Sequence, residues 1–168
     1  VYFLADTTIN ATPDADTLTD IVRLTAETVE YFANTPVMAM ISHANFGSNR
    51  DDEARMVHSV VERLHSESPE IAVDGEMQLQ YALNTSLRDS TYPFNHLNGR
   101  DVNTLIFPSL SAGNAAYRMI LEMGVGEAIG PVQMGLNKPV HFIAVDSPVR
   151  DIFNLITVAA IDAQYHHA

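Results

Sequence analysis

Acidic side chains are the first candidates for chemistry in this chain. Asp74 and Glu76 flank a single glycine and could serve as an acid–base pair. An Asp-Gly pair at the end of a strand is also a common turn, and this structural interpretation is the stronger of the two. Asp6 and Asp51 resemble residues that cap helices or turns. The carboxylates by themselves therefore do not define a catalytic site.

The seven histidines raise the question of a metal site. His58 and His65 are seven residues apart, which places them on one helix face but two turns, or about 10 Å, from each other. That separation is too large for one ion. His43 and His141 follow different strand regions, and no trio of ligands is evident around them. We therefore predict no metal site, and we expect the histidines at 166–167 to belong to a frayed tail.

Length and composition limit the class of protein. A chain of 168 residues with 46% hydrophobic and 18% charged residues fits one folded domain. The formal charge of −12 disfavours nucleic acid as a partner, because phosphate binding needs clustered lysine and arginine. The absence of cysteine excludes disulfides, thiolate catalysis and cysteine-based metal sites. No signal peptide or membrane-spanning run is visible, so we expect a cytoplasmic protein with no membrane partner.

Strand and helix patterns alternate along the chain. Short apolar runs predict strands at residues 1–5, 37–41, 71–73, 105–107 and 140–145, and helical periodicity predicts helices at 14–33, 51–67, 77–87, 115–123 and 149–163. This alternation predicts an α/β fold with three layers, in which helices cover both faces of a largely parallel sheet. Residues 92–99 have no periodicity, so we expect them to form an exposed excursion.

Three segments with turn chemistry follow predicted strands, at residues 42–48, 74–76 and 109–114. Ligands of parallel sheets bind outside the carboxyl ends of the strands, so these segments are candidate binding loops. Gly47-Ser48 and Gly113-Asn114 each place flexible backbone near a helix N-terminus, where free amides can hold an anion. Most such pairs are simply turns and caps, so the pattern alone does not choose between the two roles.

The last predicted helix, within residues 148–164, is apolar around most of its circumference. Its polar positions form only a narrow stripe, which consists of Asp151, Asn154 and Thr157. A helix on the surface of a single subunit would have about half of its circumference polar. Two explanations remain open. The helix is either a central core helix of one subunit or a contact to another half of the molecule or to a second chain.

Several motifs together resemble one known family. The run from Gly130 to Asn154 begins Gly-Pro-Val-Gln-Met-Gly-Leu-Asn-Lys-Pro-Val, and residues 41–48 read Ile-Ser-His-Ala-Asn-Phe-Gly-Ser. Further matching positions lie at residues 1–14, 74–77, 106–114 and 117. The chain resembles the phosphate acetyltransferase/butyryltransferase (phosphotransacetylase) family over nearly all of residues 1–168. The resemblance implies an isocitrate dehydrogenase-like fold and about the C-terminal half of a complete module. Because the first residue is not methionine, we expect a piece of a longer polypeptide.

In active members of this family, a Ser-Arg pair at the end of a strand handles the phosphoryl and acetyl groups. Here the corresponding residues are Ala144 and Val145. Neither side chain can donate a hydrogen bond, and the positive charge that would stabilise the transition state is missing. Asp151 matches an acidic residue with a catalytic role in the family, so it either keeps a ligand role or only caps the last helix. We therefore assign no catalytic residue.

This combination resembles the C-terminal domain of large bacterial NADP-dependent malic enzymes, which binds acetyl-CoA as an inhibitor and helps to oligomerise the enzyme. The resemblance implies acetyl-CoA or CoA as a partner, and further copies of the chain that form at least a dimer. NADP and a divalent metal would bind in upstream domains, and no cofactor is expected within this chain. The alternatives are a subunit of an active phosphate acetyltransferase and a purely structural dimerisation domain without a ligand.

The acetyl-CoA site that the resemblance implies combines loop and helix residues. Its candidate residues are Ser42, Asn45, Gly47, Ser48, Gly113, Asn114, Tyr117, Lys138 and Asp151. Lys138 is the only lysine of the chain, so a polyanion bound near it would depend on few cations and on backbone amides.

Overall fold

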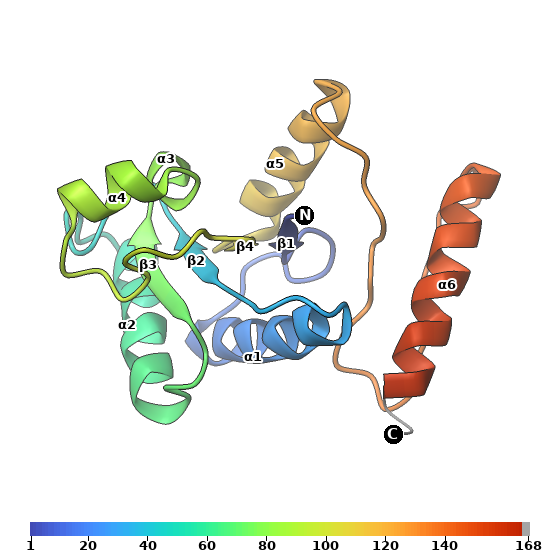
Figure 1. Cartoon of the computed structure of the whole chain (residues 1–168), viewed down its shortest axis with the longest axis horizontal. Helices are drawn as coiled ribbons and strands as arrows, with labels where there is room; N and C mark the ends of the chain where they lie inside the picture. The colour runs from blue at the N-terminus through green and yellow to red at the C-terminus, as the bar shows by residue number, and fades with distance from the viewer. Residues whose placement is uncertain (166–168) are drawn as a thin grey trace.

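A parallel sheet of four strands forms the centre of the computed structural model, which describes residues 1–165 (Figure 1). The strands are β1 (Phe3–Ala5), β2 (Met38–Ile41), β3 (Val73–Met77) and β4 (Thr104–Ile106). Their order across the sheet is β1-β4-β2-β3, and every neighbouring pair is parallel. The predicted parallel α/β sheet is confirmed. The tail expected at 166–167 lies outside the described residues.

Helices cover both faces of this sheet. They are α1 (Ala15–Tyr31), α2 (Asp52–Glu67), α3 (Leu79–Ala82), α4 (Thr85–Thr91), α5 (Leu110–Glu122) and α6 (Val149–Tyr165). Figure 1 shows α1 and α2 on one face and α3, α4 and α5 on the other. The apolar core divides accordingly into one cluster between the sheet and α1–α2 and a second cluster between the sheet and α3 and α5. The three-layer prediction is therefore confirmed.

Strand β2 lies in the middle of the sheet, which explains its continuously apolar sequence. All four of its residues are buried, because β4 and β3 pair along its two edges while helices cover its faces. Met38 lies opposite Thr104 of β4 and opposite Val73 of β3. Strand β1 pairs with β4, with Phe3 opposite Thr104.

Strand β3 is longer than its sequence pattern suggested. The predicted strand covered residues 71–73, whereas β3 extends from Val73 to Met77 with every residue buried. Residues 74–76 therefore lie inside the sheet, and the expectation of a turn after the strand is wrong. The reason is tertiary, because both acids find polar partners when buried. His58 of α2 contacts Glu76 (3.0 Å), and the backbone N of His96 donates to Asp74 (2.6 Å).

Side-chain caps move two helix boundaries away from their predicted positions. The helix expected at 77–87 is divided into α3 and α4, because Asn84 accepts a hydrogen bond from the backbone N of Leu87 and starts a new helix. Helix α5 begins at Leu110 rather than at residue 115, since Ser109 caps its first turn.

The strand expected at residues 140–145 does not form. Segment 124–148 between α5 and α6 contains no helix or strand, and the side chains of Val140, Phe142 and Val145 are exposed. An extended segment needs a neighbouring strand to pair its backbone N–H and C=O groups. Within residues 1–165, the sheet has four strands and none of them lies beside this segment.

Helix α6 stands beside α1 at the end of the long connecting segment (Figure 1). It buries Leu155, Val158 and Asp162, while Phe153 and Ile156 stay 69% and 63% exposed. It is therefore not a central core helix of this chain, and a large part of its apolar circumference faces outward.

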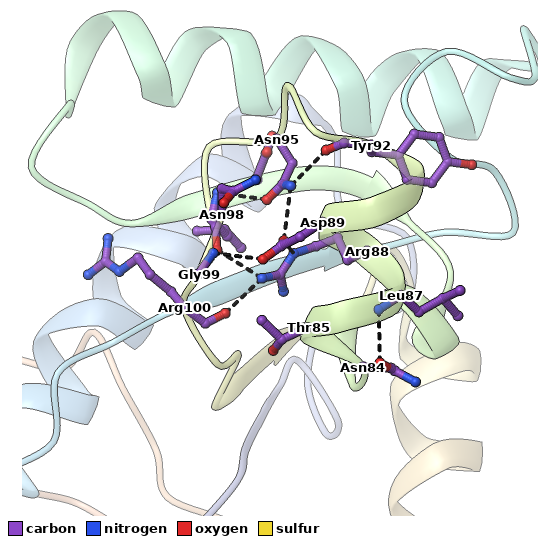
Figure 2. A network of polar contacts seen from close by, with 12 residues as sticks. Asn84, Thr85, Leu87, Arg88, Asp89, Tyr92, Asn95, Asn98, Gly99 and Arg100 are labelled. Atoms are coloured by element: carbon purple, nitrogen blue, oxygen red, sulfur yellow. Dashed lines mark hydrogen bonds and ion pairs between the residues drawn. The ribbon is translucent and has the colours of Figure 1, made fainter.

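Figure 2 shows how Arg88 of α4 holds segment 92–100 against the domain. The Arg88 side chain is completely buried, and its Nη2 donates to the backbone oxygens of Leu97 (2.8 Å) and Arg100 (2.7 Å). Its Nε donates to Oδ1 of Asp89 (3.1 Å). The segment expected to be an exposed excursion is therefore anchored from within the fold.

The neighbouring carboxylate of Asp89 continues this network. It accepts hydrogen bonds from the backbone N of Gly99 (2.7 Å) and from Nδ2 of Asn95 (3.2 Å). Burial alone would raise the pKa of Asp89, but the hydrogen bonds from Gly99 and Asn95 and the charge of Arg88 lower it. Asn95 is buried and Phe94 is exposed, so the predicted exposure of this segment is only partly correct.

Candidate ligand site at the carboxyl edge of the sheet

Because all four strands are parallel, their carboxyl ends meet at one edge of the sheet. The chain leaves this edge through residues 6–14 after β1, 42–51 after β2 and 107–109 after β4. Ligands of such sheets bind at this edge. Strands β4 and β2 are neighbours, so the loop after β2 and the N-terminus of α5 start from adjacent strands.

The loop after β2 is fastened to the end of β3. The backbone N of Phe46 donates to the carbonyl oxygen of Glu76 (2.8 Å), and the backbone N of Gln78 donates to Oδ1 of Asn45 (2.9 Å). The loop also closes on itself, since Oγ of Ser48 accepts from the backbone N of Asn45 (2.9 Å). The predicted ligand residues of this loop are Ser42, Asn45, Gly47 and Ser48. The structure therefore brings these four together.

The buried carboxylate of Glu76 supports the same loop. Glu76 is completely buried at the end of β3, its Oε1 accepts from the backbone N of Gly47, and its Oε2 lies 3.0 Å from Nδ1 of His58 in α2. Such charge-assisted hydrogen bonds offset the free-energy cost of burying a carboxylate. Gly47 has a φ of +83°, which side-chain-bearing residues rarely adopt, so the glycine allows its amide to point at Glu76.

Sequence reasoning missed the pairing of Glu76 with His58. It compared Asp74 with Glu76 and His58 with His65, whereas the structure pairs Glu76 with His58 and leaves His65 4.0 Å from Asp74. The sequence does contain a signal for this pairing. Asp74 and Glu76 are two residues apart in a strand and so share one face of it, and His58 and His65 are seven residues apart in a helix and share one face there. A crossover helix that follows β2 must pack on the sheet, which aligns the two sets.

His43 links the loop to the start of α2. Its Nε2 lies 2.8 Å from Oδ2 of Asp51 and 3.1 Å from Nδ2 of Asn49. Asp51 is the N-cap of α2, as expected, and accepts from the backbone N of Ala54 (3.0 Å). That hydrogen bond, followed by the contact with His43, lowers the pKa of Asp51.

A second polar turn follows β1 at the same edge. Oδ1 of Asp6 accepts from the backbone N of Thr8 (2.7 Å) and Ile9 (3.0 Å), and Oδ2 accepts from the backbone N of Asn10 (2.7 Å). Burial alone would raise the pKa of Asp6, but these backbone hydrogen bonds outweigh it and lower the pKa. The expected turn-capping role of Asp6 is confirmed.

The first turn of α5 packs on this second turn. Gly113 is buried against the backbone of Asp6, and Nδ2 of Asn114 donates to the carbonyl oxygen of Thr7 (3.2 Å). Tyr117 follows one turn later on the same helix. Gly113, Asn114 and Tyr117 thus form a second group of predicted ligand residues, at the β1–β4 side of the carboxyl edge.

Lys138 lies apart from both groups. It lines a hollow of about 220 Å³ between α1 and α6, with Glu27, Tyr31 and Asp162 among the other lining residues. Helix α1 runs from the carboxyl end of β1 to the start of β2, so its last residue, Tyr31, lies toward the opposite edge of the sheet. Burial, followed by the negative charge of Asp162, raises the pKa of Tyr31.

A buried pair beside this hollow ties segment 124–148 to α6. Nε2 of His141 lies 3.1 Å from Oδ2 of Asp162, and the backbone N of Gln133 donates to Nδ1 of His141 (3.1 Å). Because Nδ1 accepts, the imidazole carries its proton on Nε2 and donates it to Asp162. His43 and His141 therefore belong to separate regions.

The remaining predicted positions lie on this same C-terminal part. Ala144 and Val145 are exposed within segment 124–148 and add no polar side chain. Asp151 lies in the first turn of α6, where Nε of Arg150 is 3.5 Å from its Oδ1. A carboxylate in this position interacts favourably with the helix dipole.

The carboxyl edge is polar, and its loop amides donate to acceptors within the protein, such as Glu76, Ser48 and Asp6. Among residues 1–165, no group of three or more histidine, cysteine, aspartate or glutamate side chains is placed to hold a metal ion. No helix in that range is long and apolar enough to cross a membrane. Ordered loops and a helix N-terminus suit the recognition of an anionic ligand.

The sequence profile of the phosphate acetyl/butaryl transferase family matches residues 1–160. The chain belongs to this family. The phosphate acetyl/butaryl transferase fold is also evident in three dimensions, since a phosphotransacetylase from Streptococcus pyogenes has a TM-score of 0.91 and 34% identity. That similarity covers 98% of this chain and 50% of the other. A branched-chain phosphotransacylase from Enterococcus faecalis, at 18% identity and a TM-score of 0.70, shares the fold.

Relatives of this phosphate acetyl/butaryl transferase family member fall into two kinds. The chain is 36% identical over 163 residues to the NADP-dependent malic enzyme of Salmonella typhimurium. These aligned residues cover 96% of this chain and 21% of the relative. It is 35% identical over 162 residues to the phosphate acetyltransferase of Bacillus subtilis. These aligned residues cover 96% of this chain and 50% of the relative. The chain therefore spans half or less of the length of both relatives.

Proposed function

We propose that this family member is a regulatory and oligomerisation domain of a multidomain NADP-dependent malic enzyme, and that it binds acetyl-CoA or CoA without acyl transfer. The observation that carries the proposal is the pair Ala144–Val145, which is apolar and exposed at the positions where the family resemblance implies the Ser-Arg pair of active transferases. Acyl transfer to phosphate brings two anionic groups together, and an arginine fork neutralises them in the transition state. Binding does not need that fork, because backbone amides and apolar walls contribute to it.

The carboxyl edge supports the binding half of this proposal. The loop at 42–48 is held by Glu76 and Gln78, so it is preformed rather than ordered by a ligand. The N-terminus of α5 lies at the same edge and favours a negatively charged group through its dipole. In a chain of charge −12, such local dipoles matter for a ligand that carries phosphates.

We keep Lys138 and Asp151 as proposed ligand residues. They would contact a different part of the ligand from the part that the carboxyl-edge residues contact. Lys138 faces the hollow between α1 and α6, and Asp151 begins α6. An elongated molecule such as CoA would contact these residues only if it extends from the carboxyl edge toward α6. Substitutions at the carboxyl edge and at Lys138 or Asp151 therefore distinguish two cases. Both weaken ligand binding if the site is continuous, and only one of them does if the two regions are separate.

The apolar surface of the C-terminal part supports the oligomerisation half. Large side chains are exposed along α5, segment 124–148 and α6, including Met119, Met123, Val125, Ile129, Val145, Val149, Phe153 and Ile156. Large exposed apolar side chains in such number are typical of an interface in a folded protein. We propose that it packs against another part of the module or against a second chain.

One assay separates the proposal from the active-transferase alternative, which the 35% identity to the Bacillus subtilis phosphate acetyltransferase favours to a similar degree. Formation of acetyl-CoA from acetyl phosphate and CoA is measured with the full-length protein that carries this chain, alongside direct binding of acetyl-CoA by calorimetry. We expect binding with turnover far below the ordinary range of about 1 per second or faster. Turnover in that range would establish the transferase instead. Absence of both binding and turnover would leave the purely structural role.

A further inference from the structure

Two histidines from different elements meet at the edge of the sheet opposite the candidate ligand site. His65 lies in the last turn of α2, and His96 belongs to the segment that Arg88 anchors. Their rings are stacked, with centroids 3.9 Å apart and planes inclined by 34°. Nε2 of His65 and Nδ1 of His96 are 3.0 Å apart, although 31 residues separate them in sequence. The proposed acetyl-CoA site uses neither residue.

A third atom determines which of the two facing nitrogens carries a proton. Nε2 of His65 lies 2.8 Å from the carbonyl oxygen of Val73, which can only accept a hydrogen bond, so this nitrogen is a donor. Nδ1 of His96 must then accept from the same N–H group, and an imidazole nitrogen accepts only when it carries no proton. His96 is therefore neutral in this arrangement, with its single proton on Nε2.

We propose that the contact between His65 and His96 is an acid-sensitive clasp, which holds segment 92–100 against α2 only while Nδ1 of His96 carries no proton. A proton on that nitrogen would place two N–H groups head to head across 3.0 Å, so the hydrogen bond would be lost. A proton on Nδ1 of His65 would leave Nε2 and its hydrogen bonds in place. His96 is thus the member of the pair whose protonation opens the clasp.

Charged groups from several elements surround the pair. They are Asp74 of β3, Glu70 after α2, Arg100 of the segment itself, and Arg88 and Asp89 of α4. Oδ1 of Asp74 lies 4.0 Å from Nε2 of His65, and Oδ2 accepts from the backbone N of His96 (2.6 Å). A protonated pair would therefore keep a negative charge beside it. What acid removes is the hydrogen bond between the rings.

The contacts that join the segment to α4 should persist in mild acid. Arg88 stays charged at any such pH and holds the backbone oxygens of Leu97 and Arg100. Although burial opposes it, the hydrogen bond from Gly99 keeps the pKa of Asp89 below its ordinary value, so this carboxylate remains an acceptor. Opening the clasp would therefore release the segment from α2 alone.

The same segment reaches the candidate ligand loop at its other end. The rings of Tyr92 and Phe94 contact Phe46 of the loop at 42–48, with centroids 4.8 Å and 5.4 Å from it. The clasp would thus make the support of this loop sensitive to pH. The proposal itself does not depend on acetyl-CoA binding.

Nitrogen-15 NMR of the imidazole rings tests the protonation state in the unaltered chain. At pH 8, Nδ1 of His96 should give the resonance of a bare nitrogen and Nε2 of His65 that of a protonated one. An isolated imidazole gains its second proton at about pH 6.5, so a series from pH 8 to pH 5 samples both states. A proton on Nδ1 of His96 at pH 8 would overturn the proposal.

Amide hydrogen exchange measures whether acid releases the segment. Protection factors at positions 96 and 97, corrected for the intrinsic pH dependence of exchange, should fall about fivefold or more from pH 8 to pH 5, the effect of losing one hydrogen bond. The fall should vanish in His96→Gln, because glutamine takes up no proton. His43→Gln, which removes an exposed histidine outside the pair, should behave as the parent does. Constant protection in the parent, or an undiminished fall in His96→Gln, would rule out the clasp.

Discussion

Gly113 of α5 lies directly against the backbone oxygen of Asp6, because a Cβ built at position 113 would be 2.2 Å from that oxygen. No side chain larger than hydrogen fits there without movement of the backbone. The missing Cβ allows the first turn of α5 to approach the end of β1, so that Asn114 reaches the carbonyl oxygen of Thr7. One glycine thus joins two of the segments that leave the carboxyl edge.

Gly113→Ala should destabilise the domain by about 1–3 kcal/mol, the usual range for overpacking against fixed neighbours. The free energy of unfolding would be measured by urea denaturation. Gly126→Ala is a matched control, because a Cβ at that position meets nothing within 4 Å. The control should stay within about 0.5 kcal/mol of the parent. Equal effects of the two substitutions would contradict the close packing of α5 on Asp6.

Glu76→Gln and Glu76→Ala should have graded effects on the loop at 42–48. Glutamine keeps an acceptor for the amide of Gly47 and should cost about 1–2 kcal/mol, whereas alanine leaves that amide without its acceptor and should cost about 2–4 kcal/mol. Hydrogen exchange of the Gly47 amide, followed by NMR, should speed up most in the alanine variant. Glu62→Gln removes an exposed carboxylate near His58 and serves as the control. Unaltered protection of Gly47 in Glu76→Ala would mean that Glu76 does not hold the loop.

Asp6 should contribute to loss of stability in acid. Backbone hydrogen bonds hold the pKa of folded Asp6 below its ordinary value of 3.8, so its stabilising contribution is present above that value and is lost as the pH falls through the folded pKa. The free energy of unfolding should therefore decline from about pH 5 downward. In Asp6→Asn, which keeps the side-chain shape, stability at neutral pH should be lower and the acid decline shallower. Parallel pH profiles of the two proteins would exclude Asp6 as a source of the decline.

The chain should be a dimer or a larger oligomer, because α6 exposes large apolar side chains such as Phe153 and Ile156. Size-exclusion chromatography with light scattering would measure the mass. Phe153→Glu places a charge on the exposed side of α6 and should shift the protein toward monomer. Gln80→Glu, which adds the same single negative charge on an exposed side chain of α3, provides a comparison. A monomeric parent at tens of micromolar would show that no second copy covers this surface.

Lys138→Glu should weaken inhibition of malate oxidation by acetyl-CoA in the full-length protein, if the ligand extends into the hollow between α1 and α6. The charge reversal acts on the only lysine in the chain. Arg55→Glu makes the same charge change on an exposed side chain of α2, away from the proposed ligand residues, and is the control. Malate or NADP should weaken acetyl-CoA binding by the same factor by which acetyl-CoA weakens theirs. Unchanged inhibition in a stable Lys138→Glu enzyme would remove Lys138 from the site.

Long elements with clear periodicity were predictable from the sequence. Helices α1 and α2 lie within two residues of their predicted bounds, and β2 was recognised because a fully buried strand is apolar throughout. The two groups of candidate ligand residues, Ser42–Ser48 and Gly113–Tyr117, lie at one edge of the sheet. This location was predictable, because the carboxyl ends of parallel strands lie at the same edge.

The errors have tertiary causes. β3 contains Asp74 and Glu76, which no apolar pattern marks as buried, and their partners are the backbone N of His96 and the side chain of His58. The predicted strand at 140–145 has a suitable composition but no neighbouring strand within the described chain. Lys138 was grouped with the loops by resemblance, while its position depends on how α6 packs on α1. Each of these facts concerns a partner distant in sequence, which local patterns do not encode.

The strand order has a consequence for the way the chain is synthesised. β1 is made before the other three strands of this sheet, but its neighbour is β4, about one hundred residues later. β2 and β3 can pair much sooner, since only α2 and its connections separate them. The amino-terminal strand must therefore wait until residues 104–106 have been added before it finds its place. A growing chain would assemble its sheet from β2–β3 outward and close it at β1, with the longest loop closure last.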